Sequence, residues 1–144
     1  MSQKTLQWLQ AWMQAGWLRR LDVSLAAQLL RLDPQASPPL LVATALLAHM
    51  EGRGHTCLPL QQLLQAPAAW LAWPAQAVQG EQGLQALWAH MPATVSAWQQ
   101  ALQSSVLRHV DAPDEGQPLV LGGSPEEPLL YLRRYAAYEQ RVGQ

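Results

Sequence analysis

The chain has 144 residues, the length of one domain, and its 49% of hydrophobic residues excludes an intrinsically disordered protein. Only 13% of the residues are charged and the formal net charge is −1, so no bulk positive charge is present to attract nucleic acid. A surface with so few charges is a poor design for an isolated monomer, and we expect residues 1–144 to form a single domain partly covered by a partner.

A first helix is predicted from apolar residues that recur every three or four positions, namely Leu6, Leu9, Met13 and Trp17. Trp8 and Trp12 widen this apolar face, and Gly16 ends or bends the helix. The three tryptophans cannot all face one core stripe, so we expect at least one of them to stay partly exposed. Because tryptophan is enriched among interface hot spots, Trp8, Trp12 and Trp17 are the candidate partner interface.

Two further helices are predicted before residue 52. Asp22 is a suitable N-cap for the second, which the stretch "LDPQASPP" ends. Ser37 followed by Pro38 combines a capping side chain with a proline at the first helical position, so a third helix begins there and ends near Gly52. This helix is apolar nearly all round, and we expect it to be the most buried element.

The rest of the chain is predicted to change from helix to strand. Gly52 and Gly54 turn the chain into a short extended segment, and Pro59 then opens a short helix. Prolines interrupt residues 66–104, which predicts two or three short helices there. From residue 105, short β-branched or aromatic segments alternate with the turn-like stretches "DAPDEG" and "GGSPEE".

The predicted fold class is therefore α+β and mostly helical. The helical N-terminal two-thirds is followed by a small antiparallel sheet or hairpin pair. The segment "YLRRYAAYEQRV" then bends from a strand into a short C-terminal helix.

The predicted location is the cytoplasm. A single cysteine excludes an internal disulfide and favours an intracellular protein. Glutamines interrupt the N-terminal segment "MSQKTLQWLQAWMQ", which is not the pattern of a signal peptide. The longest apolar run, "LLVATALLA", is too short to span a membrane, so we expect no membrane association.

The stretch "EGRGHTCLPL", residues 51–60, holds the one cysteine and raises the question of catalysis. His55 and Cys57 lie two residues apart on one face of an extended segment, which leaves no room for a group to orient the base. A zinc site made of His49, His55 and Cys57 lacks a fourth ligand. We therefore assign no catalytic or metal-binding residue and expect Cys57 to be a buried, unreactive thiol.

Two other stretches resemble ligand-binding motifs only in part. "LVLGGSPEE" resembles a phosphate-binding loop, but no lysine follows its glycines, and Lys4 is the only lysine in the chain. No cofactor-binding residue is assigned. Arg133 and Arg134, which lie among tyrosines, are candidate contacts to single-stranded DNA, although two arginines neutralise few phosphates.

Residues 46–63, "LLAHMEGRGHTCLPLQQL", resemble the N-terminal region of RecD, the alpha subunit of the RecBCD helicase–nuclease, exodeoxyribonuclease V. "RLDVSLAAQLL" and "PLVLGGSPEEPLLYLRRYAAYE" resemble earlier and later segments of that region, in the same order. The residues that match the central pattern, as structural positions only, are Gly54, His55, Cys57, Leu58 and Pro59. The late turn departs from the family by the inserted "SPEEP" and by Gly122, where a cysteine is often found.

The resemblance implies a non-catalytic domain that docks RecD, a 5′-to-3′ helicase, onto RecC within the complex that also holds RecB. It implies a role in DNA recombination and double-strand-break repair, with RecC and the rest of RecD as partners and DNA contacted only indirectly or weakly. In the family the ATPase motifs follow this region and none is in this chain. ATP and magnesium are therefore expected only for the helicase domains, and no cofactor is expected here.

Two rival interpretations remain. Three helices followed by a small sheet are compatible with a winged-helix-like module that binds single-stranded DNA. The other rival interpretation is an uncharacterised thiol enzyme.

Overall fold

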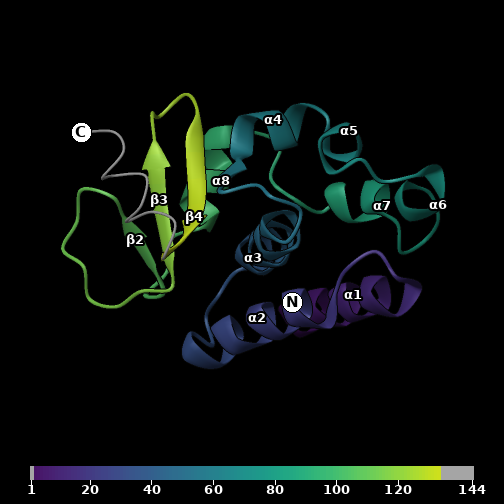
Figure 1. Ribbon diagram of the computed structural model, residues 1–144, viewed down its shortest axis with the longest axis horizontal. Coiled ribbons are helices and arrows are strands. Elements are labelled where there is room, and N and C mark those ends of the chain that lie inside the picture. Colours follow the sequence, from purple (N-terminus) through teal and green to yellow (C-terminus); the bar gives the residue numbers. More distant parts are fainter. Residues whose placement is uncertain (1, 134–144) are drawn as a thin grey trace.

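The computed structural model describes residues 2–133, and its first three helices form two layers (Figure 1). Helices α1 (Ser2–Ala15) and α2 (Arg20–Leu32) lie next to each other, and both pack on α3 (Pro38–Glu51). Gly16, with a φ of +94°, ends α1 as predicted, because its left-handed backbone stops the helix. The three N-terminal helices predicted from the sequence are therefore confirmed.

Helix α3 forms the centre of the molecule, and every residue from Pro39 to Ala48 is buried. The predicted start is confirmed, since the Ser37 side chain accepts a hydrogen bond from the Leu40 backbone N–H and Pro38 opens the helix. Thr44 is the polar exception in the middle of the helix. Its hydroxyl donates to the Leu40 carbonyl at 2.7 Å, so burial leaves it satisfied.

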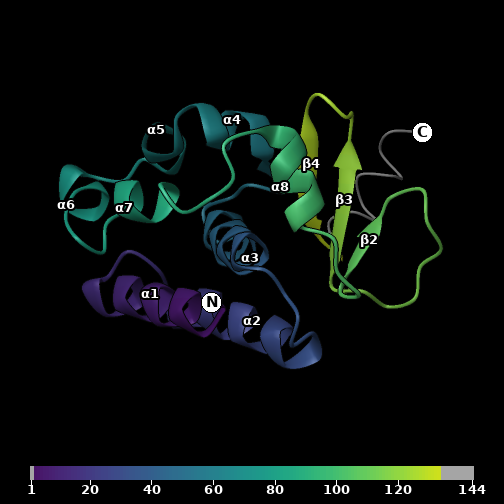
Figure 2. The same ribbon diagram turned by 180° about the vertical axis from the view of Figure 1, so that it is seen from behind.

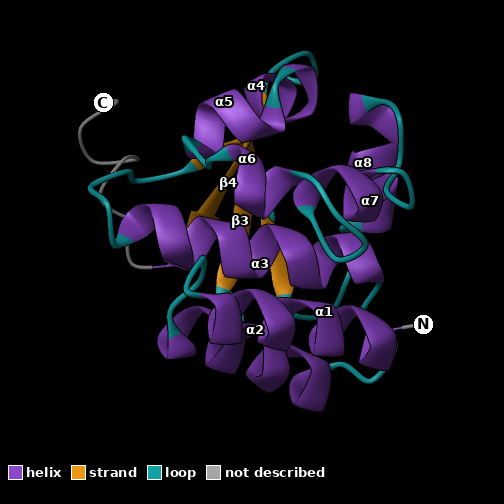
Figure 3. Ribbon diagram, turned by 90° about the vertical axis from the view of Figure 1, so that its right-hand side faces the viewer, coloured by secondary structure: helices purple, strands orange, loops and turns teal. Residues whose placement is uncertain are grey.

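Short helices cover α3 on the side away from α1 and α2 (Figure 3). They are α4 (Leu60–Gln65), α5 (Pro67–Leu71), α6 (Ala75–Val78), α7 (Leu84–Trp88) and α8 (Val95–Ala101). Residues 66–104 thus contain four short helices, where the sequence predicted two or three. Seen from the opposite side, α8 stands beside the sheet, where it packs on α3 and α4 (Figure 2).

The sheet has four short strands in the order β1-β4-β3-β2. They are β1 (Leu58–Pro59), β2 (Leu107–His109), β3 (Leu119–Gly123) and β4 (Pro128–Leu132). Strands β3 and β4 form the predicted hairpin, and Gly123 is required in its turn because a Cβ there would lie 2.4 Å from the Glu127 carbonyl oxygen. The α+β, mostly helical fold class is confirmed.

One feature of the predicted sheet is wrong: β2 and β3 pair in parallel, so the sheet is mixed rather than antiparallel. The turn-like "DAPDEG" does not make a hairpin. It belongs to a longer excursion, residues 110–118, that returns the chain to the end of the sheet where β2 began. The predicted C-terminal helix lies outside the described residues.

Within residues 2–133, no helix combines the length and apolarity needed to cross a bilayer.

The central position of α3 predicts that truncation of its side chains is costly. Leu46→Ala, at a fully buried position, should lower the free energy of unfolding by about 2–5 kcal/mol. Leu21→Ala is the matched control, since Leu21 is 62% exposed and should cost less than about 0.5 kcal/mol. Urea denaturation measures both, and equal losses would contradict the central role of α3.

Candidate functional site

The stretch at residues 51–60 serves as a connector between α3 and the sheet. Gly54, with a φ of +98°, turns the chain, and the His55 backbone N–H donates to the Met50 carbonyl at 3.0 Å, which seals the end of α3. Leu58 is fully buried and pairs with Leu130 of β4. The next residue of the motif, Pro59, pairs with Leu129, so the motif supplies the edge strand of the sheet.

Cys57 is half-buried, so the prediction of a buried thiol is wrong. The reason is the strand alternation: Leu58 turns its side chain into the core, and its neighbour on the chain therefore faces the other way. His55 is exposed and its ring lies 5.4 Å from that of Trp70, measured between centroids. Among residues 2–133, no group of three or more His, Cys, Asp or Glu side chains is placed to hold a metal ion.

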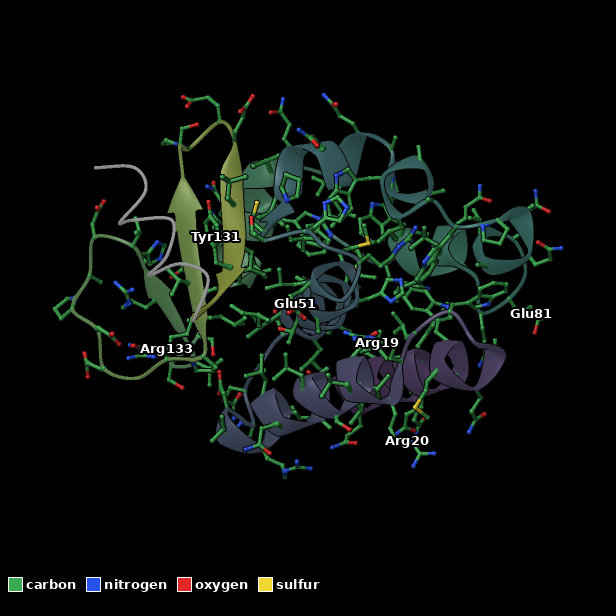
Figure 4. The ribbon with its side chains drawn as sticks, viewed as in Figure 1. Arg19, Arg20, Glu51, Glu81, Tyr131 and Arg133 are labelled. Carbon is green, nitrogen blue, oxygen red and sulfur yellow. The ribbon has the colours of Figure 1, made fainter. Side chains whose placement is uncertain are left out.

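An ionic cluster around the buried Asp22 joins the start of α2 to the end of α3. Asp22 is 0% exposed and accepts hydrogen bonds from the Arg19 backbone N–H at 2.9 Å and from the Arg19 guanidinium at 2.7 and 3.1 Å. His49 Nδ1 lies 3.3 Å from the same carboxylate, and the Arg19 guanidinium also donates to the Ala48 carbonyl at 2.7 Å. Arg19 and the nearby Glu51 are both shown in Figure 4.

Asp22 is therefore not the N-cap that the sequence predicted. Helix α2 begins at Arg20, and Asp22 is its third residue, whose side chain reaches back to the Arg19 N–H. Burial opposes ionisation of Asp22, but hydrogen bonds from His49 and Arg19 more than offset it and lower the pKa of Asp22. The hydrogen bond to Asp22 raises the pKa of Arg19. Asp22 and Arg19 thus stay ionised at neutral pH, and the hydrogen bonds of Arg19 to Asp22 and to the Ala48 carbonyl fix α2 to α3.

The three candidate tryptophans occupy different environments. Trp12 is 2% exposed and packs edge-on against Trp73, with centroids 5.0 Å apart, so it belongs to the core. Trp8 and Trp17 are half-buried, which agrees with the expectation that at least one stays partly exposed. The indole N–H groups of Trp8 and Trp12 donate to the same carbonyl, that of Gln82, at 2.9 and 2.7 Å. These two bonds hold α1 against the loop that precedes α7.

A groove of about 670 Å³ opens beside Trp8. Its walls come from α1, the start of α3 and the end of α7, and we call it the α1–α7 groove. The lining residues are Lys4, Thr5, Trp8, Pro38, Pro39, Leu87, His90, Met91 and Pro92. Its surface is mainly apolar, and the His90 ring stands edge-on to Trp8 with centroids 6.3 Å apart.

A second groove, of about 470 Å³, lies between α2 and the end of β4. Leu21 and Leu25 line it from α2, and Arg19, Glu51 and Arg133 bring charge to it. Leu21, at 62%, is one of the large apolar side chains that remain exposed in the described part of the chain. This groove is smaller and more charged than the α1–α7 groove.

Of the two arginines proposed for DNA contact, Arg133 belongs to the described residues. Arg133 is exposed and forms an ion pair with Asp114, which lies in the excursion before β3 (Figure 4). The hydrogen bond from Arg133 lowers the pKa of Asp114, so both groups are charged at neutral pH. The positive charge of Arg133 therefore already has a partner. Arg134 lies outside the described residues.

Sequence reasoning named Trp8 but missed the rest of the α1–α7 groove. Lys4 lies more than 80 positions before His90 and Met91 in the chain. None of these residues belongs to a motif, so no local pattern marks them. Only the packing of α7 beside α1 brings them together.

Two comparisons with known proteins bear on this geometry. The model of the family described as "RecBCD enzyme subunit RecD, N-terminal domain" matches residues 14–125. Among curated proteins, no sequence matches the chain.

The buried carboxylate of Asp22 predicts how stability depends on pH. The pKa of Asp22 is lower in the folded state than in the unfolded chain, so its contribution is present above the ordinary aspartate value of about 3.9 and is lost as pH falls through the lowered value. Asp22→Asn should cost about 1–3 kcal/mol at pH 7, and that cost should shrink as the pH approaches 2. Urea midpoints across this range measure it.

The control for this test is Asp111→Asn, at an exposed position. It should change stability by less than about 0.5 kcal/mol at every pH. A cost for Asp22→Asn that stays constant between pH 7 and pH 2 would show that the carboxylate charge does not stabilise the fold.

Proposed function

The chain belongs to the family of RecD N-terminal domains, and we propose on that basis that it is a docking domain that holds RecD in the RecBCD complex. Its partner in this proposal is RecC, with the helicase domains of RecD as the alternative. The domain contributes no catalysis of its own. ATP and magnesium are used by the helicase domains, and the docking serves DNA recombination and double-strand-break repair in the cytoplasm.

The observation that carries the proposal is Trp8 at the edge of the α1–α7 groove. Trp8 is half-buried and its indole N–H already donates to the Gln82 carbonyl, so its remaining apolar surface can be covered without stranding a polar group. Tryptophan is one of the residue types enriched among interface hot spots. The low charge content of the chain supports the same role, because charged residues are depleted at interface cores.

The groove also has the shape that docking requires. It is a concave, mainly apolar surface of about 670 Å³ built from three separate elements. Prolines at the start of α3 and after α7 stiffen its walls, because a proline ring fixes the backbone torsion φ. A stiff wall reduces the entropy lost on binding.

A second candidate function is the binding of single-stranded DNA through the C-terminal arginines. The pairing of Arg133 with Asp114 weakens this candidate, since a DNA phosphate would have to displace the carboxylate. The two candidates differ in their salt dependence, because binding through phosphates releases counterions and falls steeply with salt.

Capture of RecC by the chain tests the proposal. Trp8→Ala should weaken capture by about 1–2 kcal/mol or more, because it removes the proposed hot spot. Trp70→Ala is the matched control: Trp70 is also a half-buried tryptophan, but it lies on α5 against His55 and outside the groove. Its substitution should leave capture unchanged. Circular dichroism of both variants checks that they are folded.

Separate captures use the helicase domains of RecD and single-stranded DNA at two salt concentrations. Retention of neither protein partner, together with DNA binding that weakens steeply with salt, would replace docking by the DNA-binding function.

A further inference from the structure

We infer that the α1–α7 groove receives an acidic, apolar segment of the partner protein: one that presents large apolar side chains next to a carboxylate. This inference rests on the proposed docking function and adds the chemistry of the occupant. It is drawn from the charges around the groove and from its apolar walls.

The groove is lined by a lysine and by no acidic residue. Lys4 and His90 are the lining side chains able to carry positive charge, and no aspartate or glutamate lines the groove. Between residues 2 and 133, Lys4 takes part in none of the ion pairs that the structure contains. A carboxylate on the partner would therefore meet a cation that is not already neutralised.

Lys4 lies where the helix itself disfavours a cation. It is in the first turn of α1, which contains no acidic residue, and the amide groups of that turn already carry partial positive charge. A lysine there gains nothing from its own helix, and it is the only lysine in the chain. An acidic group bound at this end of α1 would be attracted both by Lys4 and by the helix terminus.

The apolar part of the occupant follows from the walls. Leu87, Met91 and Pro39 contribute apolar lining to the groove, and Trp8 lines it with its N–H group already bonded. The volume of about 670 Å³ is in the range that takes a group the size of a drug molecule, which is more than one large side chain. Burial of apolar side chains supplies the affinity, and the single carboxylate supplies orientation and faster association.

The same observations argue against nucleic acid as the occupant. Binding to a phosphate backbone depends on neutralising several charges, and the groove offers one lysine and one histidine. Stacking on Trp8 alone would be sequence-tolerant but weak without those charges. A partner protein with few charges and one carboxylate fits the walls better.

Charge reversal at Lys4 tests the inference in capture assays with RecC and with the helicase domains of RecD. Lys4→Glu should weaken capture about tenfold or more and reverse the salt dependence of this contact, because an attractive charge pair becomes a repulsive one that added salt screens. The matched control is Arg20→Glu. Arg20 is exposed, points outward in Figure 4, lies in the first turn of α2 and is not part of the groove, so capture should change less than about twofold.

Both substitutions should preserve folding. Each places a glutamate in the first turn of a helix, where a negative charge is favoured, and each changes the net charge by the same amount. Lys4→Gln, which removes the charge without reversing it, should give an intermediate affinity. This series separates a specific charge contact from a general effect of net charge.

The outcomes distinguish failure of the inference from failure of docking. If Trp8→Ala weakens capture while Lys4→Glu and Arg20→Glu behave alike, docking stands and the acidic occupant is wrong. Stronger capture by Lys4→Glu would also overturn it, in favour of a basic partner segment. Loss of single-stranded DNA binding in Lys4→Glu would assign the groove to nucleic acid. A self-dimer of the chain that Trp8→Ala dissociates would assign the groove to a second copy of the chain. If neither protein is captured by the unsubstituted chain, both proposals fail.

Discussion

Helix α3 is apolar on every side, and the rest of the structure is arranged to cover it. The sequence from Pro39 to Ala48 leaves no polar face that could meet water, so burial of this one helix supplies much of the driving force for folding. Helices α1 and α2 cover one side, and α4, α8 and the sheet cover the other (Figure 1). The covering elements form a single layer on each side, so apolar side chains such as Leu21 and Trp8 remain exposed or half-buried.

The two ends of α3 are held by different chemistry. Ser37 caps its N-terminus and also donates to the Ala101 carbonyl at 2.5 Å, which fastens α8 to the same point. Arg19 binds the Ala48 carbonyl near the C-terminus while it is held by the buried Asp22. Because α3 is fixed at both ends, the wall that it provides to the α1–α7 groove is positioned by the core rather than by a loop.

Short sequence patterns were sufficient to predict the helix ends that interactions between neighbouring residues determine. Ser37–Pro38 marked the start of α3, and Gly16 marked the end of α1. Nothing local revealed that β2 and β3 run parallel, because their pairing depends on where the excursion between them returns. The half-buried position of Cys57 follows from the register of Leu58, which is set by pairing with β4 more than 70 residues later. The groove brings residues 4–8 and 38–39 beside residues 87–92, and of these residues the sequence singled out Trp8 alone.

Hydrogen–deuterium exchange of the chain, free and bound to RecC, is the most direct test that the α1–α7 groove is the docking surface. The account predicts slower exchange on binding in residues 84–92 and in the first two turns of α1, with the excursion at residues 110–118 unchanged. Slower exchange confined to residues 107–123, with α1 and α7 unaffected, would place the partner on the sheet and contradict the account.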